Sequence, residues 1–357
     1  MDDRIGQLGA TVLLTLTVAA CPSSEPAAIL PDAVQVPAID EAPASFGGRI
    51  PSPMRNPLSE AGVALGRRLF YDASLSADGA VSCASCHLQN KAFSDGVPLG
   101  SEGVSGETLG RHAPVLQNLA WHDRGLFWDG GASDLESLVV APLEHPDEMA
   151  SDPADVIERL HNDPSYVAAF AAAFTAPPNM AYLMRAVAQF LRTLVSGASR
   201  YDAYRAGEIV LSDVEMRGLS VFERACSSCH PPPFFTDHDF HNLGLEAEFS
   251  DDPEDLRKGR GRITEERADF GKFKTPSLRN LHVSKPYLHD GRFGTLREVL
   301  ERYRDGLPDR AALDPLLRNA QGRAGLDLSD QELDDLEVFL VALEDPAFLT
   351  NEAFAQP

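Results

Sequence analysis

The stretch that decides the fold is CSSCH, residues 226–230, in which two thiols stand three positions apart and a histidine follows directly. The same pattern occurs once more, as CASCH at residues 83–87. Each copy offers two sulfur atoms and one imidazole. The chain has five cysteines, and only Cys21 stands outside the two motifs. An interpretation of the sequence must therefore explain both copies.

Three kinds of chemistry use cysteines at this spacing. A structural zinc site needs four ligands, whereas each copy supplies three. A redox-active pair does not require the trailing histidine and is typical of a βαβ setting, which this sequence does not indicate. A covalently attached c-type haem uses all three residues, because the thiols add to the vinyl groups and the histidine binds the iron. With zinc and disulfides as the alternatives, we expect two haems c, each with a proximal histidine, held by Cys83, Cys86, His87, Cys226, Cys229 and His230.

The composition is typical of a globular protein, with 43% hydrophobic and 24% charged residues over a length of 357. That length is enough for two domains. The formal net charge of −23 argues against nucleic-acid binding, because a basic surface is needed to neutralise phosphates. It suits a basic protein partner, such as a small cytochrome, attracted by opposite charge. The alternative is a solvated acidic surface with no partner.

The N-terminal sequence predicts export. Residues 11–20, TVLLTLTVAA, form an apolar run that is too short to span a bilayer but fits a signal peptide over residues 1–20. Val18–Cys21 resembles the lipobox of bacterial lipoproteins, although two acidic residues near the start weaken the match, and a plain cleaved signal is the alternative. We expect a periplasmic lipoprotein anchored through Cys21. No later apolar run reaches the roughly 18 residues of a membrane span.

Two similar halves follow the signal. Each contains a glycine and a phenylalanine four residues apart, ahead of its CxxCH motif: Gly66 with Phe70, and Gly218 with Phe222. This pattern favours an internal duplication. The expected organisation is a Pro- and Ala-rich tether at 21–56, an N-terminal haem domain at 57–211, a C-terminal haem domain at 212–345 and a tail at 346–357.

Helix signals dominate both halves. Capping boxes at Ser212 with Glu215 and at Ser329 with Glu332 predict two helix starts. The first helix leads into Cys226 with apolar residues on one face. The second carries a leucine stripe at helical spacing: Leu333, Leu336, Leu340 and Leu343. Because strand signals are few, we expect an all-α fold with two cytochrome c-like domains and long loops.

Two segments carry a resemblance to a known family. They are GLFWDGGASDLESLVVAPLEHPDEM at 125–149 and FKTPSLRNLHVSKPYLHDGRFGTLREVLERY at 273–303. With the two CxxCH motifs, the chain resembles the bacterial dihaem cytochrome c peroxidase/MauG superfamily from about residue 57 to residue 345. The resemblance implies that the first haem reacts with peroxide and that the second transfers electrons.

The resemblance also implies roles for single residues. Trp128 matches the tryptophan between the haems, and Glu148 matches the glutamate that serves as acid–base. Tyr303 falls at the distal ligand of the second haem, where peroxidases have methionine and MauG-like members have tyrosine. No methionine follows Met216, which agrees with this alignment. The alternatives are core aromatics for Trp128 and Tyr303 and a solvated acidic turn for Glu148.

The chain departs from the family pattern near the first haem. The family often has a glutamine ten residues after the tryptophan, where this chain has Leu138. Leucine cannot form hydrogen bonds, so the rate of the peroxidase reaction is in doubt. His145 is a candidate to compensate.

A calcium ion between the haems is also implied by the family. Its protein ligands would be the backbone carbonyls of Ser284 and Pro286 and an asparagine side chain. The asparagine position falls near His112, with Asn118 as a substitute. Because calcium prefers oxygen ligands, His112 weakens this expectation.

The leading function is reduction of hydrogen peroxide at the first haem, with electrons passing through the second haem from a small periplasmic donor, a cytochrome c or a cupredoxin. The alternative, favoured by Tyr303, is a MauG-like enzyme that uses peroxide to oxidise a tryptophan or tyrosine of a partner protein. A third hypothesis is a dihaem electron carrier without catalysis. The family resemblance also implies a homodimer.

Overall fold

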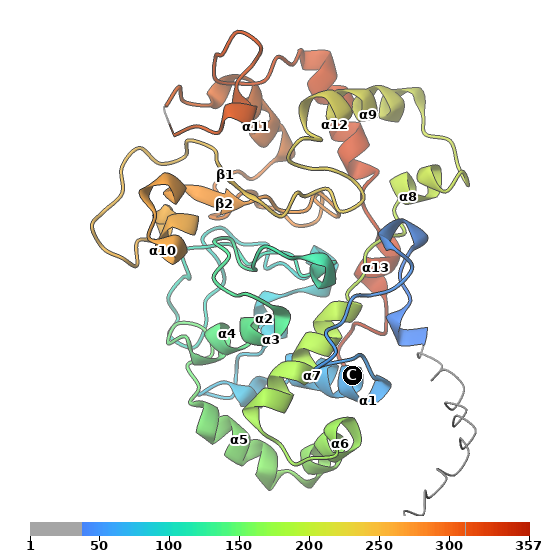
Figure 1. Cartoon of the computed structure of the whole chain (residues 1–357), viewed down its shortest axis with the longest axis vertical. Helices are drawn as coiled ribbons and strands as arrows, with labels where there is room; N and C mark the ends of the chain where they lie inside the picture. The colour runs from blue at the N-terminus through green and yellow to red at the C-terminus, as the bar shows by residue number, and fades with distance from the viewer. Residues whose placement is uncertain (1–37, 311) are drawn as a thin grey trace, which may run out of the picture. The chain divides into compact units, whose positions relative to one another are not determined.

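The computed structural model describes residues 38–310 and 312–357, which form short helices joined by long loops (Figure 1). The expected signal peptide and Cys21 lie outside the described residues. In residues 57–211, which we call the N-terminal half, the helices are α1 (Glu60–Phe70), α2 (Cys83–Cys86), α3 (Leu135–Leu138), α4 (Val140–Glu144), α5 (Pro153–Asn162), α6 (Pro164–Phe174), α7 (Met180–Thr193) and α8 (Arg200–Arg205).

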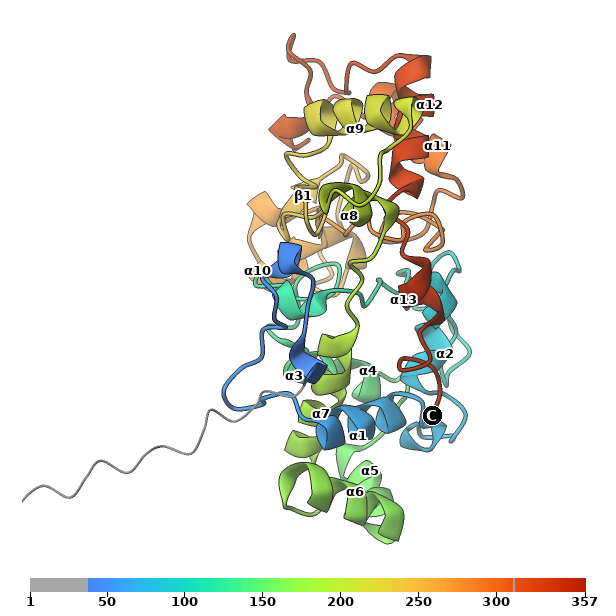
Figure 2. The same ribbon diagram turned by 90° about the vertical axis from the view of Figure 1, so that its right-hand side faces the viewer.

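In residues 212–345, the C-terminal half, helices are again joined by long loops, and α9, α11 and α12 lie at the opposite end of Figures 1 and 2 from α1, α5 and α6. Among the described residues, no helix has the length and apolar character needed to cross a bilayer. The helices of this half, with the helix of the tail, are α9 (Asp213–Ala225), α10 (Arg260–Thr264), α11 (Leu296–Glu301), α12 (Asp330–Val341) and α13 (Pro346–Thr350).

The fold is not purely helical, because the described residues include one two-stranded antiparallel sheet. Strand β1 (Phe240–Asn242) pairs with β2 (Lys272–Lys274), with Phe240 opposite Lys274. Each strand has three residues. This is too short for the alternating pattern that identifies strands in a sequence, which explains why the sheet was not expected.

Helix α1 packs along α7 through a close approach at a glycine. A Cβ atom on Gly66 would lie 1.9 Å from the carbonyl oxygen of Ala186, so a larger residue would force the helices apart. One turn later, the Phe70 ring packs against Phe190 with centroids 5.3 Å apart. These contacts fix the helix that precedes the first CxxCH motif.

The C-terminal half repeats this contact between α9 and α12. A Cβ atom on Gly218 would lie 2.0 Å from the carbonyl oxygen of Asp335. The Phe222 ring packs against Phe339 with centroids 5.2 Å apart. In both halves, the helix that precedes the CxxCH motif packs on its neighbour through a glycine and a phenylalanine four residues apart.

Both predicted capping boxes are confirmed. Ser212 and Glu215 begin α9, and Ser329 and Glu332 begin α12. Helix α9 ends at Ala225, so it delivers Cys226 directly to the second motif. The predicted leucine stripe is buried in the core of the C-terminal half.

The tail at 346–357 returns to the N-terminal half, where the C-terminus lies near α1 in both ribbon views (Figures 1 and 2). Arg67 Nε donates to the carbonyl oxygen of Ala355 at 2.6 Å, and the Tyr71 hydroxyl donates to that of Phe354 at 2.7 Å. The Phe348 ring packs on Phe93 with centroids 5.8 Å apart. The tail is therefore part of the N-terminal core.

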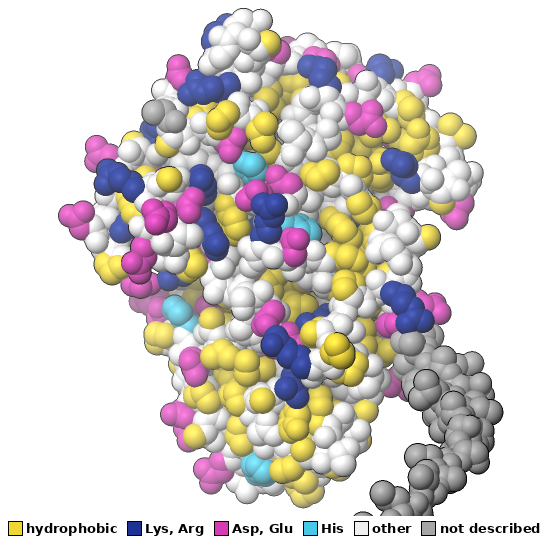
Figure 3. Space-filling view, viewed as in Figure 1, with side chains coloured by type: hydrophobic (Ala, Val, Ile, Leu, Met, Phe, Trp, Pro, Cys, Tyr) yellow, Lys and Arg dark blue, Asp and Glu magenta, His cyan; other side chains and the backbone are white. Residues whose placement is uncertain are grey.

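Figure 3 shows how charged side chains are distributed over one face, which tests whether that face carries an acidic patch for the expected basic partner. On this face, acidic side chains are interspersed with Lys and Arg. Attraction to a partner at this face would therefore come from the net charge of the chain more than from one acidic patch.

Candidate haem sites

The first motif lies on α2 and the residue after it. The ring nitrogen Nδ1 of His87 is 2.6 Å from the carbonyl oxygen of Phe93. Burial lowers the pKa of His87, which favours the neutral imidazole that a metal binds. Burial also raises the pKa of the Cys83 thiol to about 12.

The second motif repeats this geometry at the end of α9. His230 Nδ1 is 3.0 Å from the carbonyl oxygen of Phe235, and burial lowers the pKa of His230. Histidines that bind metals usually donate their other ring nitrogen to such an acceptor. In both motifs this leaves Nε2 as the ring nitrogen available to a metal.

The cysteines and other buried groups test whether the chain fits haem. All four motif cysteines are free thiols, so neither motif is a disulfide. Two further histidines, His122 and His238, stack with ring centroids 4.1 Å apart. His122 Nδ1 and His238 Nε2 are buried and have no hydrogen-bond partner within the described residues. The two free thiols and the buried, neutral imidazole of each motif are the donor set that a haem c takes, so the residues present fit haem.

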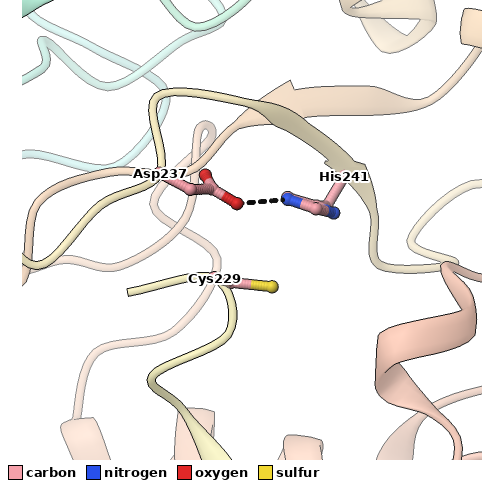
Figure 4. A group of neighbouring side chains, drawn as sticks. All are labelled: Cys229, Asp237 and His241. Atoms are coloured by element: carbon pink, nitrogen blue, oxygen red, sulfur yellow. Dashed lines mark hydrogen bonds and ion pairs between the residues drawn. The ribbon is translucent and has the colours of Figure 1, made fainter. Parts of the chain in front are cut away.

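Zinc fits less well. The described residues contain one group with the spacing of metal ligands, Cys229 with Asp237 and His241 (Figure 4). Both ring nitrogens of His241 face carboxylates, with Asp237 at 2.9 Å and Asp314 at 2.7 Å. The hydrogen bond with Asp237 is the main reason that the pKa of His241 rises to about 11. His241 is therefore a bridge between two carboxylates, and Cys229 belongs to the second CxxCH motif.

Trp128 lies between the two halves and is 9% exposed. Its indole Nε1 donates to the carbonyl oxygen of His112 at 2.6 Å. Its own carbonyl oxygen accepts from the backbone N–H of Lys274 at 2.8 Å. The residue is thus held by one segment of each half.

Glu148 lies in the loop after α4 and is close enough to Cys83 and Cys86 for its charge to raise the pKa of both thiols. Burial raises the pKa of Glu148 itself. Its backbone carbonyl accepts from the Val104 N–H at 2.8 Å, which fixes the loop. A partly buried carboxyl with a raised pKa holds its proton more readily than a free carboxyl, which suits a general acid–base.

The chain departs from the family pattern at Leu138, and His145 is the candidate to compensate. Leu138 is buried in the apolar core of the N-terminal half. His145 is exposed, and its Nδ1 accepts from the Asp147 N–H at 3.2 Å.

Tyr303 lies in a short π-helix, Arg302–Gly306, that continues from α11. Burial and the nearby sulfurs of Cys229 and Cys226 raise the pKa of its hydroxyl. The tyrosine therefore lies beside the second CxxCH motif. Single π-helical turns are frequent at functional sites.

The expected calcium position contains an imidazole. His112 Nε2 is 3.3 Å from the carbonyl oxygen of Ser284, close in sequence to Pro286. The side-chain amide of Asn118 is bound instead to the backbone N–H and C=O of Ser196.

Sequence reasoning missed the contribution of the tail to the first site. A hollow of about 300 Å³ reaches His87, and three tail residues line it, Leu349, Ala355 and Gln356. No local pattern marks these residues as belonging to the N-terminal half. The stacked pair of His122 and His238 was likewise left without a role.

The chain is similar to known dihaem proteins. A family model described as di-haem cytochrome c peroxidase matches residues 60–209. The methylamine utilization protein MauG of Methylorubrum extorquens is 37% identical, over 84% of this chain and 83% of its own length. The cytochrome-c peroxidase IdrP1 of a Pseudomonas species is 34% identical, over 82% and 83%. A solved MauG-like protein associated with microbial copper homeostasis is 35% identical, with a TM-score of 0.78 over 86% of this chain and 95% of its own.

Proposed function

Because this chain belongs to the dihaem cytochrome c peroxidase and MauG family, we propose that it consumes hydrogen peroxide and takes the electrons from a partner protein. The family implies two c-type haems and an oxidoreductase. Bound haem would supply the iron chemistry that reduces peroxide. The groups would be held by Cys83, Cys86 and His87 in one half and by Cys226, Cys229 and His230 in the other.

Glu148 would move the proton. Reduction of peroxide to two waters consumes two electrons and two protons, and cleavage is easier when a proton leaves one oxygen and returns to the other. The raised pKa of Glu148 and its place beside the first motif support this role. The apolar Leu138 nearby supplies no second hydrogen-bonding group.

Trp128 would connect the two sites. Its indole is buried and fixed by hydrogen bonds to one segment from each half. A rigid aromatic group in this position supports a relay of electrons between the halves.

The observation that carries the choice of electron source is the phenol of Tyr303 beside Cys226 and Cys229. Burial favours the neutral phenol in the protein alone, and binding to iron would displace the proton. An anionic oxygen ligand stabilises the more oxidised state of iron and lowers its potential. We infer that the second site favours oxidation, so the enzyme is of the MauG-like type and oxidises a tryptophan or tyrosine of a partner protein.

The second candidate is the cytochrome c peroxidase type, in which a small periplasmic cytochrome or cupredoxin supplies electrons one at a time. The relative named cytochrome-c peroxidase IdrP1, at 34% identity, keeps this candidate open.

Electron paramagnetic resonance of the ferric holoprotein, before and after one equivalent of peroxide, separates the candidates. Loss of both ferric signals without a donor, with the oxidised state persisting, supports the MauG-like type. Reaction at the first haem alone, and only after pre-reduction, supports the peroxidase type. Two low-spin haems that ignore peroxide would leave an electron carrier and refute both candidates.

Three further expectations accompany this proposal. The matched crossings at Gly66 and Gly218 support an internal duplication. Export and lipidation of Cys21 can be tested by mass spectrometry of the membrane-extracted protein. Sedimentation of the holoprotein tests for a homodimer.

A further inference from the structure

His112 joins the two halves through both its backbone and its ring. Its N–H donates to the carbonyl oxygen of His289 at 2.7 Å, and its carbonyl oxygen accepts from Trp128 Nε1 at 2.6 Å. The side chain is almost fully buried, at 4% exposed. One residue thus holds the indole and a loop of the C-terminal half.

The ring of His112 contacts oxygen atoms on both sides. Nε2 lies 3.0 Å from Ser94 Oγ and 3.3 Å from the carbonyl oxygen of Ser284. The Ser94 hydroxyl donates to the carbonyl oxygen of Ala113 at 2.8 Å, which leaves Oγ free to accept from Nε2. A carbonyl oxygen only accepts, so Nε2 carries a hydrogen.

The other ring nitrogen faces a carboxylate. His112 Nδ1 lies 2.5 Å from Oδ1 of Asp95, whose side chain is fully buried. The contact holds the ring against the carboxylate by proximity, and Nδ1 makes no aligned hydrogen bond there. The ring therefore bridges Asp95, eight residues after His87 and two after its partner Phe93, to Ser284 in the C-terminal half.

These residues do not fit the calcium ion that the family implies. Calcium takes six to eight oxygen ligands at about 2.3–2.6 Å. Here the carbonyl oxygen of Ser284 faces a ring N–H, and a nitrogen that donates a hydrogen bond cannot coordinate a cation. The position expected to supply an amide oxygen supplies this ring instead.

We propose that the imidazole of His112 replaces calcium as the link between the two halves, so that the holoprotein keeps its arrangement without the metal. The link runs from Asp95 through the ring to Ser284, and the His112 carbonyl holds Trp128. The inference goes beyond the proposed function, because it concerns what holds the halves together and not what they react with.

The first test is the calcium content of the purified holoprotein after dialysis against a chelator. We expect far less than one calcium per chain, and the same melting temperature with added calcium chloride as with chelator. One calcium retained per chain, or a melting temperature that rises with calcium, would overturn the proposal. Neither measurement uses peroxide, so the result is independent of the proposed function.

The second test restores an oxygen donor with His112→Asn. We expect its melting temperature to rise with added calcium, while wild type and the exposed control His161→Asn do not respond. If added calcium changes the melting temperature of His112→Asn no more than that of wild type, the proposal that the His112 ring replaces the calcium ion is contradicted. If the variant does not fold, the calcium content of wild type decides the matter alone.

Discussion

The indole Nε1 of Trp128 and the carbonyl oxygen of His112 are 2.6 Å apart and form a hydrogen bond between buried groups. The His112 N–H in turn donates to His289 in the C-terminal half. The indole orientation is therefore fixed by the backbone and does not depend on a mobile side chain. A fixed aromatic group held by both halves is the geometry that the proposed relay requires.

We predict that Trp128→Phe slows electron transfer between the halves on the order of tenfold, equivalent to ~1.4 kcal/mol in the barrier. Phenylalanine keeps the apolar contacts but loses the Nε1 donor and the more easily oxidised indole. Stopped-flow spectra after peroxide addition measure the change at each haem.

Trp121→Phe is the matched control, because the chain has two tryptophans and Trp121 Nε1 also donates to a backbone oxygen, that of Phe46, at 3.2 Å. Equal slowing in both variants would argue against a specific relay.

We predict that Glu148→Gln lowers peroxide turnover by about 10²–10⁴-fold, the usual contribution of a general acid–base. Steady-state rates between acid and neutral pH measure this effect. Wild-type turnover should fall as the pH drops through the raised pKa of Glu148, because the carboxylate form accepts the proton. The exposed Glu144→Gln should leave both rate and pH profile unchanged.

The same substitution should stabilise the fold. Burial raises the folded-state pKa of Glu148, so its favourable contribution is present below the ordinary value of 4.5 and is lost as the pH rises through the raised value. Glu148→Gln should therefore melt at a higher temperature than wild type at neutral pH, and this gain should disappear in acid. Lower stability at neutral pH would show that the carboxylate makes contacts that offset its burial.

Local signals in the sequence predicted local structure well. The capping boxes at Ser212 and Ser329 involve residues three apart, so the helix starts follow from short-range hydrogen bonds. The leucine stripe of α12 follows from helical periodicity in the same way. The CxxCH residues were identified because each motif places all three groups within five positions.

Contacts between distant segments could not be predicted from such signals. Arg67 donates to the carbonyl oxygen of Glu352, and the two residues are 285 positions apart. His112 was taken as an obstacle to calcium binding, and its ring contacts with Asp95 and Ser284 became evident only in three dimensions. Neither pairing has a periodic or capping signature in the sequence.

We predict that Tyr303→Phe changes the spectrum of the second haem and leaves that of the first unchanged. The substitution removes only the hydroxyl, so a phenolate ligand would be lost while the π-helix keeps its packing. Low-temperature electron paramagnetic resonance of the ferric holoprotein measures the spin state of each haem. Tyr287→Phe, at a buried tyrosine of the same half, is the control. An unchanged second-haem spectrum in Tyr303→Phe would remove this residue from the ligand set.

The tail provides a stability test for the first site. Phe348 is 2% exposed and packs against Phe93 and Phe354, with ring centroids 5.8 and 5.5 Å away. We predict that Phe348→Ala lowers the free energy of unfolding by ~3–5 kcal/mol, as expected for loss of a buried aromatic ring. Denaturant titration of the holoprotein measures this loss.

The tail also lines the hollow beside His87, so the same variant should alter the absorption spectrum of the first haem more than that of the second. Val341→Ala is the control, because Val341 is 44% exposed and belongs to α12 of the C-terminal half. If Phe348→Ala and Val341→Ala unfold at the same denaturant concentration, the tail does not contribute to the N-terminal core. If stability falls but both haem spectra stay unchanged, the tail supports the fold without shaping the first site.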